Sequence, residues 1–134
     1  MGFALLILLD THEWIWFADP SLNPRNDREN VIESLRSGGL IVSDISLLEV
    51  ANAYRKGRLQ IERPLETWLE AALSLEGVIT QRITSAIAAE SANLPGDFHK
   101  DPADRILVAP ARVLDVPLLT SDDLIRRYPH VRLA

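Results

Sequence analysis

The stretch ALLILLD at residues 4–10 decides the fold class of this chain. Its aliphatic residues run without interruption and stop at Asp10. This predicts a strand from Ala4 to Leu9 that is buried on both faces, because a half-exposed strand would alternate with polar residues. Even with Phe3, the apolar run is far shorter than the about 20 residues of a membrane-spanning helix, so we expect no membrane partner. Asp10 then lies at the carboxyl end of a buried strand.

Outward from this strand, short apolar runs alternate with helical patterns along the whole chain. Further strands are predicted at residues 40–43, 78–80, 117–120 and 131–133. Asp27 is the expected cap of the helix at 28–37. The other helices are predicted in the segment that carries Trp14, Trp16 and Phe17, and at residues 46–57, 64–75, 84–93, 102–114 and 121–127.

This alternation predicts a mainly parallel sheet, because strands separated by helices cannot pair as tight hairpins. We therefore expect residues 1–134 to form a single α/β/α sandwich domain with helices on both faces of the sheet. In such sheets, ligands bind beyond the carboxyl ends of the strands. That edge is predicted to hold Asp10 and the segment from Thr120 to Asp123.

The composition fits a folded domain in a reducing compartment. Hydrophobic residues make up 47% and charged residues 25% of the chain, and there is no cysteine, which excludes disulfides and thiolate zinc sites and favours the cytoplasm. The formal net charge of −5 argues against nucleic-acid binding through a broadly basic surface. That objection weakens if the acidic excess gathers in a pocket whose sign a bound cation reverses.

Most of the acidic candidates also have a structural explanation as helix caps. Asp10 is the exception, because an acid at the end of a buried strand is not needed to cap a long helix, although it can cap the short helix that follows. Taken singly, the other acids fit capping positions at least as well as functional ones. The groups with capping spacing are Ser46 with Glu49, Asp101 with Pro102 and Asp104, and Thr120 with Asp123.

The combination of acids is more informative than its members. Asp10, Glu49, Asp104 and Asp122 all lie at strand-to-helix junctions or in first helical turns, which a parallel sheet gathers at one edge. Helix dipoles there lower the pKa of a carboxyl group, whereas crowded like charges raise it unless a cation neutralises them. Mg²⁺ and Mn²⁺ prefer oxygen ligands and commonly activate water in phosphoryl chemistry. The pattern therefore predicts phosphodiester hydrolysis.

Four segments of the chain resemble the PIN-domain family, specifically the VapC-type ribonuclease toxins of type II toxin–antitoxin pairs. The resemblance implies an α/β/α sandwich with a Mg²⁺- or Mn²⁺-dependent endoribonuclease site. It places Asp10, Glu49, Asp104 and Asp122 at the family's acidic positions, with Asp101 as an auxiliary carboxylate. The segments that carry it are LLDTH at 8–12, VS at 42–43 with SLLEV at 46–50, HKDPADRIL at 99–107, and LTSD at 119–122.

The same resemblance implies RNA as the substrate, an antitoxin protein as a partner and a homodimer of the chain. It also implies that the Thr120 hydroxyl hydrogen-bonds a metal-binding carboxylate or a metal-bound water, which orients that ligand. Arg105 is expected either to pair with a carboxylate or to contact the phosphates of the scissile strand. Between these two roles the sequence does not choose.

Other polar and aromatic residues have simpler explanations. His12 and His99 are expected to have structural or incidental roles. For the tryptophans, packing in the core or in an interface is favoured over stacking on RNA bases. A phosphate-accepting signalling domain usually needs a lysine at a late strand end, and the chain has only Lys56 and Lys100. A non-catalytic metal-binding or protein-interaction module with the same fold is the remaining alternative, although the four acidic positions argue against it.

Overall fold

A computed structural model describes residues 5–23 and 29–134, in which four strands alternate with helices. The predicted start of the first strand at Ala4 and the predicted cap Asp27 lie outside these residues. The strands are β1 (Leu6–Leu9), β2 (Gly39–Ser43), β3 (Val78–Gln81) and β4 (Leu118–Leu119). The helices are α1 (Thr11–Ala18), the 3₁₀ helix η1 (Pro20–Leu22), α2 (Glu29–Ser37), α3 (Asp44–Arg55), α4 (Leu65–Leu73), α5 (Ser85–Ala92), α6 (Pro102–Leu114) and α7 (Asp123–Arg127).

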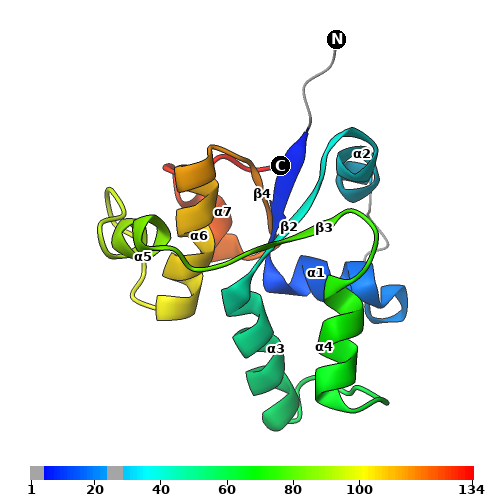
Figure 1. Ribbon diagram of the computed structural model, residues 1–134. Coiled ribbons are helices and arrows are strands. Elements are labelled where there is room, and N and C mark those ends of the chain that lie inside the picture. Colours follow the sequence, from blue (N-terminus) through cyan, green and yellow to red (C-terminus); the bar gives the residue numbers. More distant parts are fainter. Residues whose placement is uncertain (1–4, 24–28) are drawn as a thin grey trace.

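The strands form one sheet in the order β3-β2-β1-β4, and every pair is parallel. Leu8 of β1 is in register with Ile41 of β2 on one side and with Leu118 of β4 on the other. The predicted buried strand is thus an inner strand, and Leu8 and Leu9 are fully buried. Figure 1 shows the strands crossing the middle of the molecule.

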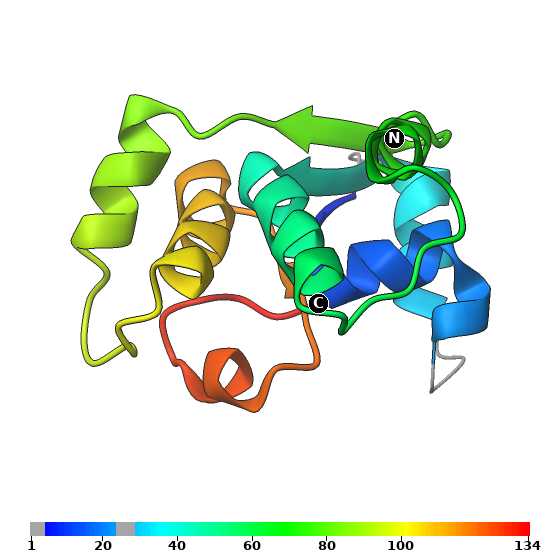
Figure 2. The same ribbon diagram turned by 90° about the horizontal axis from the view of Figure 1, so that it is seen from below.

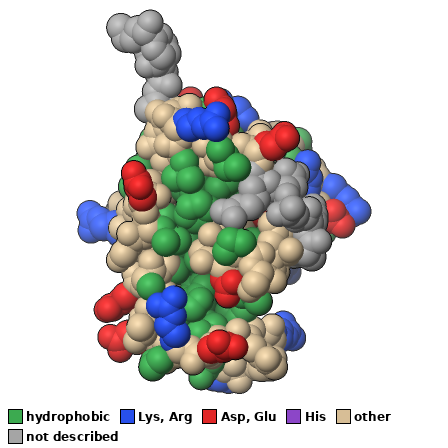
Figure 3. Space-filling model, turned by 90° about the vertical axis from the view of Figure 1, so that its right-hand side faces the viewer, with side chains coloured by type: hydrophobic (Ala, Val, Ile, Leu, Met, Phe, Trp, Pro, Cys, Tyr) green, Lys and Arg blue, Asp and Glu red, His purple; other side chains and the backbone are tan. Residues whose placement is uncertain are grey.

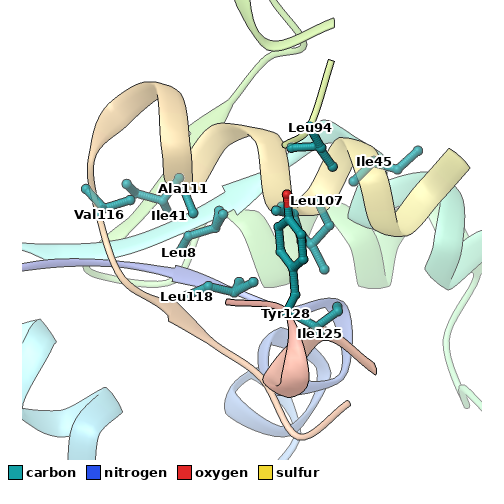
Figure 4. Packing of buried hydrophobic residues seen from close by; sticks show 11 residues of the cluster. Leu8, Ile41, Ile45, Leu94, Leu107, Ala111, Val116, Leu118, Ile125 and Tyr128 are labelled. Carbon is teal, nitrogen blue, oxygen red and sulfur yellow. The ribbon is translucent and has the colours of Figure 1, made fainter. Parts of the chain in front are cut away.

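Helices cover both faces of the sheet, which confirms the predicted α/β/α sandwich. Successive strand residues point to opposite faces, so Leu8 and Ile41 pack with α6 and α7, whereas Ile7 and Leu9 pack with α1 and α4. Figure 4 shows the first of these clusters, with Tyr128 lying among its aliphatic side chains. In Figures 1 and 2, α5, α6 and α7 lie on one side of the strands and α1, α2 and α4 on the other.

Several boundaries differ from the prediction by one or more residues, and three of the differences concern strand pairing or helix capping. The strand predicted at 131–133 is a single bridge between Leu118 and Leu133, because β4 is only two residues long and offers no longer ladder to pair with. The strand predicted at 117–120 is β4 itself, which the structure limits to Leu118–Leu119. The helix predicted from about Ser46 starts at Asp44, because the Ser43 hydroxyl accepts a hydrogen bond from Ile45 N and caps it.

The fold gathers the chain segments that follow three strands at one edge of the sheet. Asp10 follows β1, Ser43 ends β2 and Thr120 follows β4. Asp10 N donates to Leu119 O at 2.9 Å, which fixes the ends of β1 and β4 side by side. Among the described residues, no helix is long and apolar enough to cross a membrane.

Candidate active site

All five carboxylates singled out by the sequence line one cavity of about 950 Å³ at this edge. They come from four separate parts of the fold: the end of β1, helix α3, the start of α6 and the start of α7. The sequence separations are large, so only the parallel topology brings these acids together. The acids are Asp10, Glu49, Asp101, Asp104 and Asp122.

Asp10 is held by hydrogen bonds to both of its carboxylate oxygens. Oδ1 accepts from Thr11 N at 2.6 Å and caps α1, and Oδ2 accepts from the Thr120 hydroxyl at 2.6 Å. Thr120 Oγ1 in turn accepts from Asp122 N at 3.0 Å. The predicted hydrogen bond from Thr120 to a candidate ligand is therefore present. Since Asp10 and Thr120 are both buried, this pair fixes the carboxylate in one orientation.

Glu49 is positioned by a chain of hydroxyl groups. The Thr11 hydroxyl donates to Glu49 Oε1 at 2.6 Å and lies 2.8 Å from the Ser46 hydroxyl. A hydroxyl has only one proton, so Thr11 accepts from Ser46 while it donates to Glu49. The capping box predicted for Ser46 and Glu49 is wrong, because α3 begins two residues before Ser46. Glu49 has no capping role that competes with a role in the cavity.

Sequence reasoning assigned no function to Thr11 and Ser46. A usable signal existed for both. Thr11 directly follows the strand-end acid, and Ser46 lies three residues before Glu49, which places the two side chains on one helix face. The contact between α1 and α3 that joins them is long-range, and no local pattern encodes it.

The first turn of α6 holds Asp101 and Asp104 in different roles. Asp101 Oδ1 accepts from Ala103 N at 2.9 Å and Asp104 N at 3.3 Å, so Asp101 is the predicted N-cap, with Pro102 as the first helical residue. Asp104 Oδ2 lies 3.1 Å from His99 Nε2, an ion-pair distance without the alignment of a hydrogen bond. His99 thus lies beside the acidic cluster, closer to the site than its loop position suggested.

At α7, the capping acid is Asp122. Its Oδ1 accepts from Ile125 N at 3.0 Å. The capping scheme predicted for Thr120 with Asp123 is wrong, since Thr120 bonds to Asp10 and Asp123 is already the first helical residue. Asp122 lines the cavity, whereas the exposed Asp123 does not.

Three of the acids have raised pKa values. Burial is the largest cause for each, and it raises the pKa of Asp10 and of Glu49 above their ordinary values. For Asp104, burial and the nearby charges of Asp101 and Asp122 raise the pKa to about 6. The predicted lowering by helix dipoles is therefore outweighed by burial and crowding. The cluster lacks enough positive charge of its own to balance its carboxylates.

This donor set fits a hard divalent cation. The available ligands are carboxylate oxygens, which Mg²⁺ and Mn²⁺ prefer, and their mutual repulsion is what a cation would relieve. No three acidic or histidine side chains of residues 5–23 and 29–134 stand in a ready-made coordination geometry. Binding would therefore have to draw the side chains inward, and Asp10 and Glu49, held by hydroxyl groups, are the most fixed starting points.

Arg105 does not pair with a carboxylate, which was one of the two roles predicted for it. Its Nε donates to Ser91 O at 2.9 Å, and its Nη1 lies 3.3 Å from Phe98 O and 3.4 Å from His99 O. The guanidinium thus ties α6 to the loop before it. This contact positions the loop beside Asp104, and within residues 5–23 and 29–134 no arginine forms an ion pair with the five acids.

The tryptophans divide into two groups. Trp14 and Trp68 are buried and meet edge to face, and Trp14 Nε1 donates to Ala72 O at 3.1 Å, so the predicted core packing is confirmed for both. Trp16 is half-buried and lines the cavity together with the exposed His12. The two rings lie 5.8 Å apart.

Comparisons with known proteins agree with this fold. The PIN domain family model matches residues 7–131. Ribonuclease VapC22 of Mycobacterium tuberculosis is 32% identical over 126 residues, 94% of each chain. The structure of VapBC2 from Rickettsia felis bound to a promoter DNA fragment matches with a TM-score of 0.71 at 15% identity, over 97% of this chain and 98% of that one. DNA-bound VapBC from Salmonella typhimurium matches with a TM-score of 0.70 at 17% identity, over 97% of both chains.

Proposed function

Since the chain belongs to the PIN-domain family and, within it, to the VapC ribonucleases, we propose that it is a divalent-cation-dependent endoribonuclease that acts as the toxin of a toxin–antitoxin pair in the cytoplasm. The observation that carries the proposal is the set of five carboxylates around one cavity. Raised pKa values at Asp10, Glu49 and Asp104 support it, because perturbed acids in a cleft are typical of functional sites.

In the proposed reaction, Asp10, Glu49, Asp104 and Asp122 hold Mg²⁺ or Mn²⁺, and Asp101 assists from the first turn of α6. A divalent cation bound there supplies an activated water and neutralises charge on the phosphate. Thr120 and Thr11 keep two of the carboxylates in fixed orientations. The RNA backbone would enter the cavity, where Asp10 is buried and Glu49 and Asp104 are half-buried, so that the contacts of these three acids are partly shielded from solvent and strengthened.

We propose an antitoxin protein and a second copy of the chain as protein partners. Support comes from the VapBC structures that the fold resembles. Support also comes from the surface, since Figure 3 shows hydrophobic side chains gathered in a strip down one face and bordered by charged residues. Apolar residues also stay exposed elsewhere, with Ile79 on the edge strand β3 at 44% and Ile32 on α2 at 46%. Patches of this kind mark protein interfaces.

The function is tested by incubating a panel of cellular RNAs with the purified protein and Mg²⁺ or Mn²⁺. The wild-type protein should cut at internal sites. Asp10→Asn and Asp104→Asn should cut at least about 100-fold more slowly, because losing only the group that supports a metal ligand already costs about 10–100-fold. Asp123→Asn is the matched control, an acid adjacent to the site but outside the cavity. Metal binding without cleavage of any RNA would favour the non-catalytic module with the same fold.

A further inference from the structure

The cavity has a second wall whose chemistry is opposite to that of the acids. Of the described lysine and arginine residues, only Lys56 and Arg58 line the cavity, and both are exposed. Neither forms an ion pair with residues 5–23 or 29–134. In a chain with a net charge of −5, two unneutralised cations on the wall of an acidic cavity call for an explanation.

A helix-end explanation covers only one of these residues. Lys56 is the C-cap of α3, where a cation complements the negative end of the helix dipole. Arg58 lies beyond that helix end. Between them, Gly57 has a φ of 73°, a left-handed conformation that turns the chain there. Both side chains nevertheless line the same cavity, so the dipole does not account for the pair.

The aromatic residues of α1 form the third feature of this cavity. His12 and Trp16 are four residues apart on one helix, which places them on the same face, and both line the cavity. The neighbouring residue Phe17 does not line it. Three apolar residues also line the cavity: Ile15, Leu22 and Leu59.

The two helices carry these features to similar distances from the acids. At a rise of about 1.5 Å per residue, Trp16 lies about 9 Å along α1 from Asp10, and Lys56 about 10 Å along α3 from Glu49. Both helices leave the same edge of the sheet (Figure 1). If the scissile phosphate of an RNA strand lay over the acids, the neighbouring part of that strand would therefore meet the aromatic surface and the two cations.

We propose that Lys56, Arg58, Trp16 and His12 form a binding subsite for single-stranded RNA, in which a phosphate next to the scissile one contacts the cations and a base stacks on the Trp16 indole. This inference rests on the proposed function and names the form of its substrate. Cations that track the backbone, combined with aromatic rings for the bases, are what single-strand binding requires. A base paired in a helix offers no free face for such stacking.

The cations are tested by binding of a fluorescent single-stranded RNA in EDTA, which keeps the strand intact. The double variant Lys56→Gln with Arg58→Gln should bind at least about tenfold more weakly at low salt. The slope of log K against log salt should fall in magnitude by about 0.7, because the subsite neutralises one phosphate and each phosphate contact on a single strand contributes about 0.7. The control is Arg55→Gln with Arg63→Gln, which removes the same charge from exposed positions outside the cavity.

The aromatic contact is tested in the same assay. Trp16→Leu should weaken binding by about tenfold, whereas Trp16→Phe should keep most of it, because stacking needs a ring and not the indole N–H. Both variants keep an apolar side chain at this half-buried position, and Phe17→Leu controls for loss of packing in α1. A base-paired RNA of the same sequence should bind more weakly than the single strand and should respond less to Trp16→Leu.

These results separate the subsite from the proposed function. Equal binding by the charge variant and its control would overturn the subsite, as would failure of the wild-type protein to bind the single strand in EDTA. If an acidic peptide of a protein partner occupied this part of the cavity instead of RNA, the charge variant and its control would bind the RNA equally. Loss of binding in the variants together with no cleavage of any RNA in Mn²⁺ would support the subsite while contradicting the nuclease proposal.

Discussion

Replacing Asp104 by asparagine should stabilise the metal-free protein at neutral pH. Asparagine resembles the protonated carboxyl group in shape, so Asp104→Asn removes the charge and little else. The pKa of Asp104 rises from 3.8 to about 6 on folding, because the group is partly buried and faces Asp101 and Asp122. The folded state therefore resists ionisation of this carboxyl group, which the unfolded chain accepts readily.

The sign and size follow from this shift. With a raised folded-state pKa, the group's favourable contribution is complete below pH 3.8 and is lost as the pH rises through about 6. At about 1.4 kcal/mol for each pKa unit, the loss is at most about 3 kcal/mol. The Asp104 side chain keeps 21% of its exposure, and screening by solvent lowers the expected value to about 1–2 kcal/mol.

Thermal unfolding in EDTA measures this effect. For a domain of this size, about 1–2 kcal/mol corresponds to a rise in Tm of about 3–8 °C for Asp104→Asn at pH 7.5. At pH 4 the gain should largely disappear, because Asp104 is then protonated in the folded wild-type protein. Asp123→Asn should change Tm little at either pH. A lower Tm for Asp104→Asn at pH 7.5, or an equal gain at both pH values, would refute the reasoning.

Three further predictions concern the same cavity. Thr120→Val should leave Asp10 Oδ2 without its hydrogen-bond donor, lower the free energy of unfolding by about 1–3 kcal/mol in urea titrations and reduce cleavage, whereas Thr120→Ser should restore both. Affinity for Mn²⁺, measured by calorimetry, should fall as the pH drops through about 6, since Asp104 must lose its proton to bind; a pH-independent affinity would contradict this. Thr11→Val should raise the Mn²⁺ concentration needed for half-maximal cleavage, because Glu49 loses its donor, and Thr11→Ser is the control that should not.

The architecture could be predicted from the sequence because it follows from local patterns of apolar and polar residues. The uninterrupted aliphatic run before Asp10 identified an inner strand, and the spacing of strands and helices identified a parallel sheet. The end of the chain was predicted less well, since Val131 and Leu133 alternate with Arg132 as in a strand, but Leu133 forms only a single bridge, to Leu118 of β4. Strand length there depends on the partner, which no local pattern describes.

The structure brings the predicted acids together in one cavity, but the sequence did not reveal the groups that hold them. Strand-end positions were enough to expect Asp10 and Asp122 at one edge. The hydroxyl chain from Ser46 through Thr11 to Glu49 joins α3 to α1, so neither helix reveals it alone. Of the two roles considered for Arg105, the ion pair was wrong, because its side chain reaches carbonyl groups of α5 and of the loop before α6 instead of its sequence neighbour Asp104.

The central claim is that these carboxylates bind a divalent cation, and a Mn²⁺ titration followed by electron paramagnetic resonance of the free ion tests it most directly. At pH 7.5, the wild-type protein and Asp123→Asn should bind Mn²⁺ with equal affinity. Asp10→Asn and Asp104→Asn should each bind at least about tenfold more weakly, as expected when a site of this kind loses a ligand or its support. Equal Mn²⁺ binding by all four proteins would contradict the account.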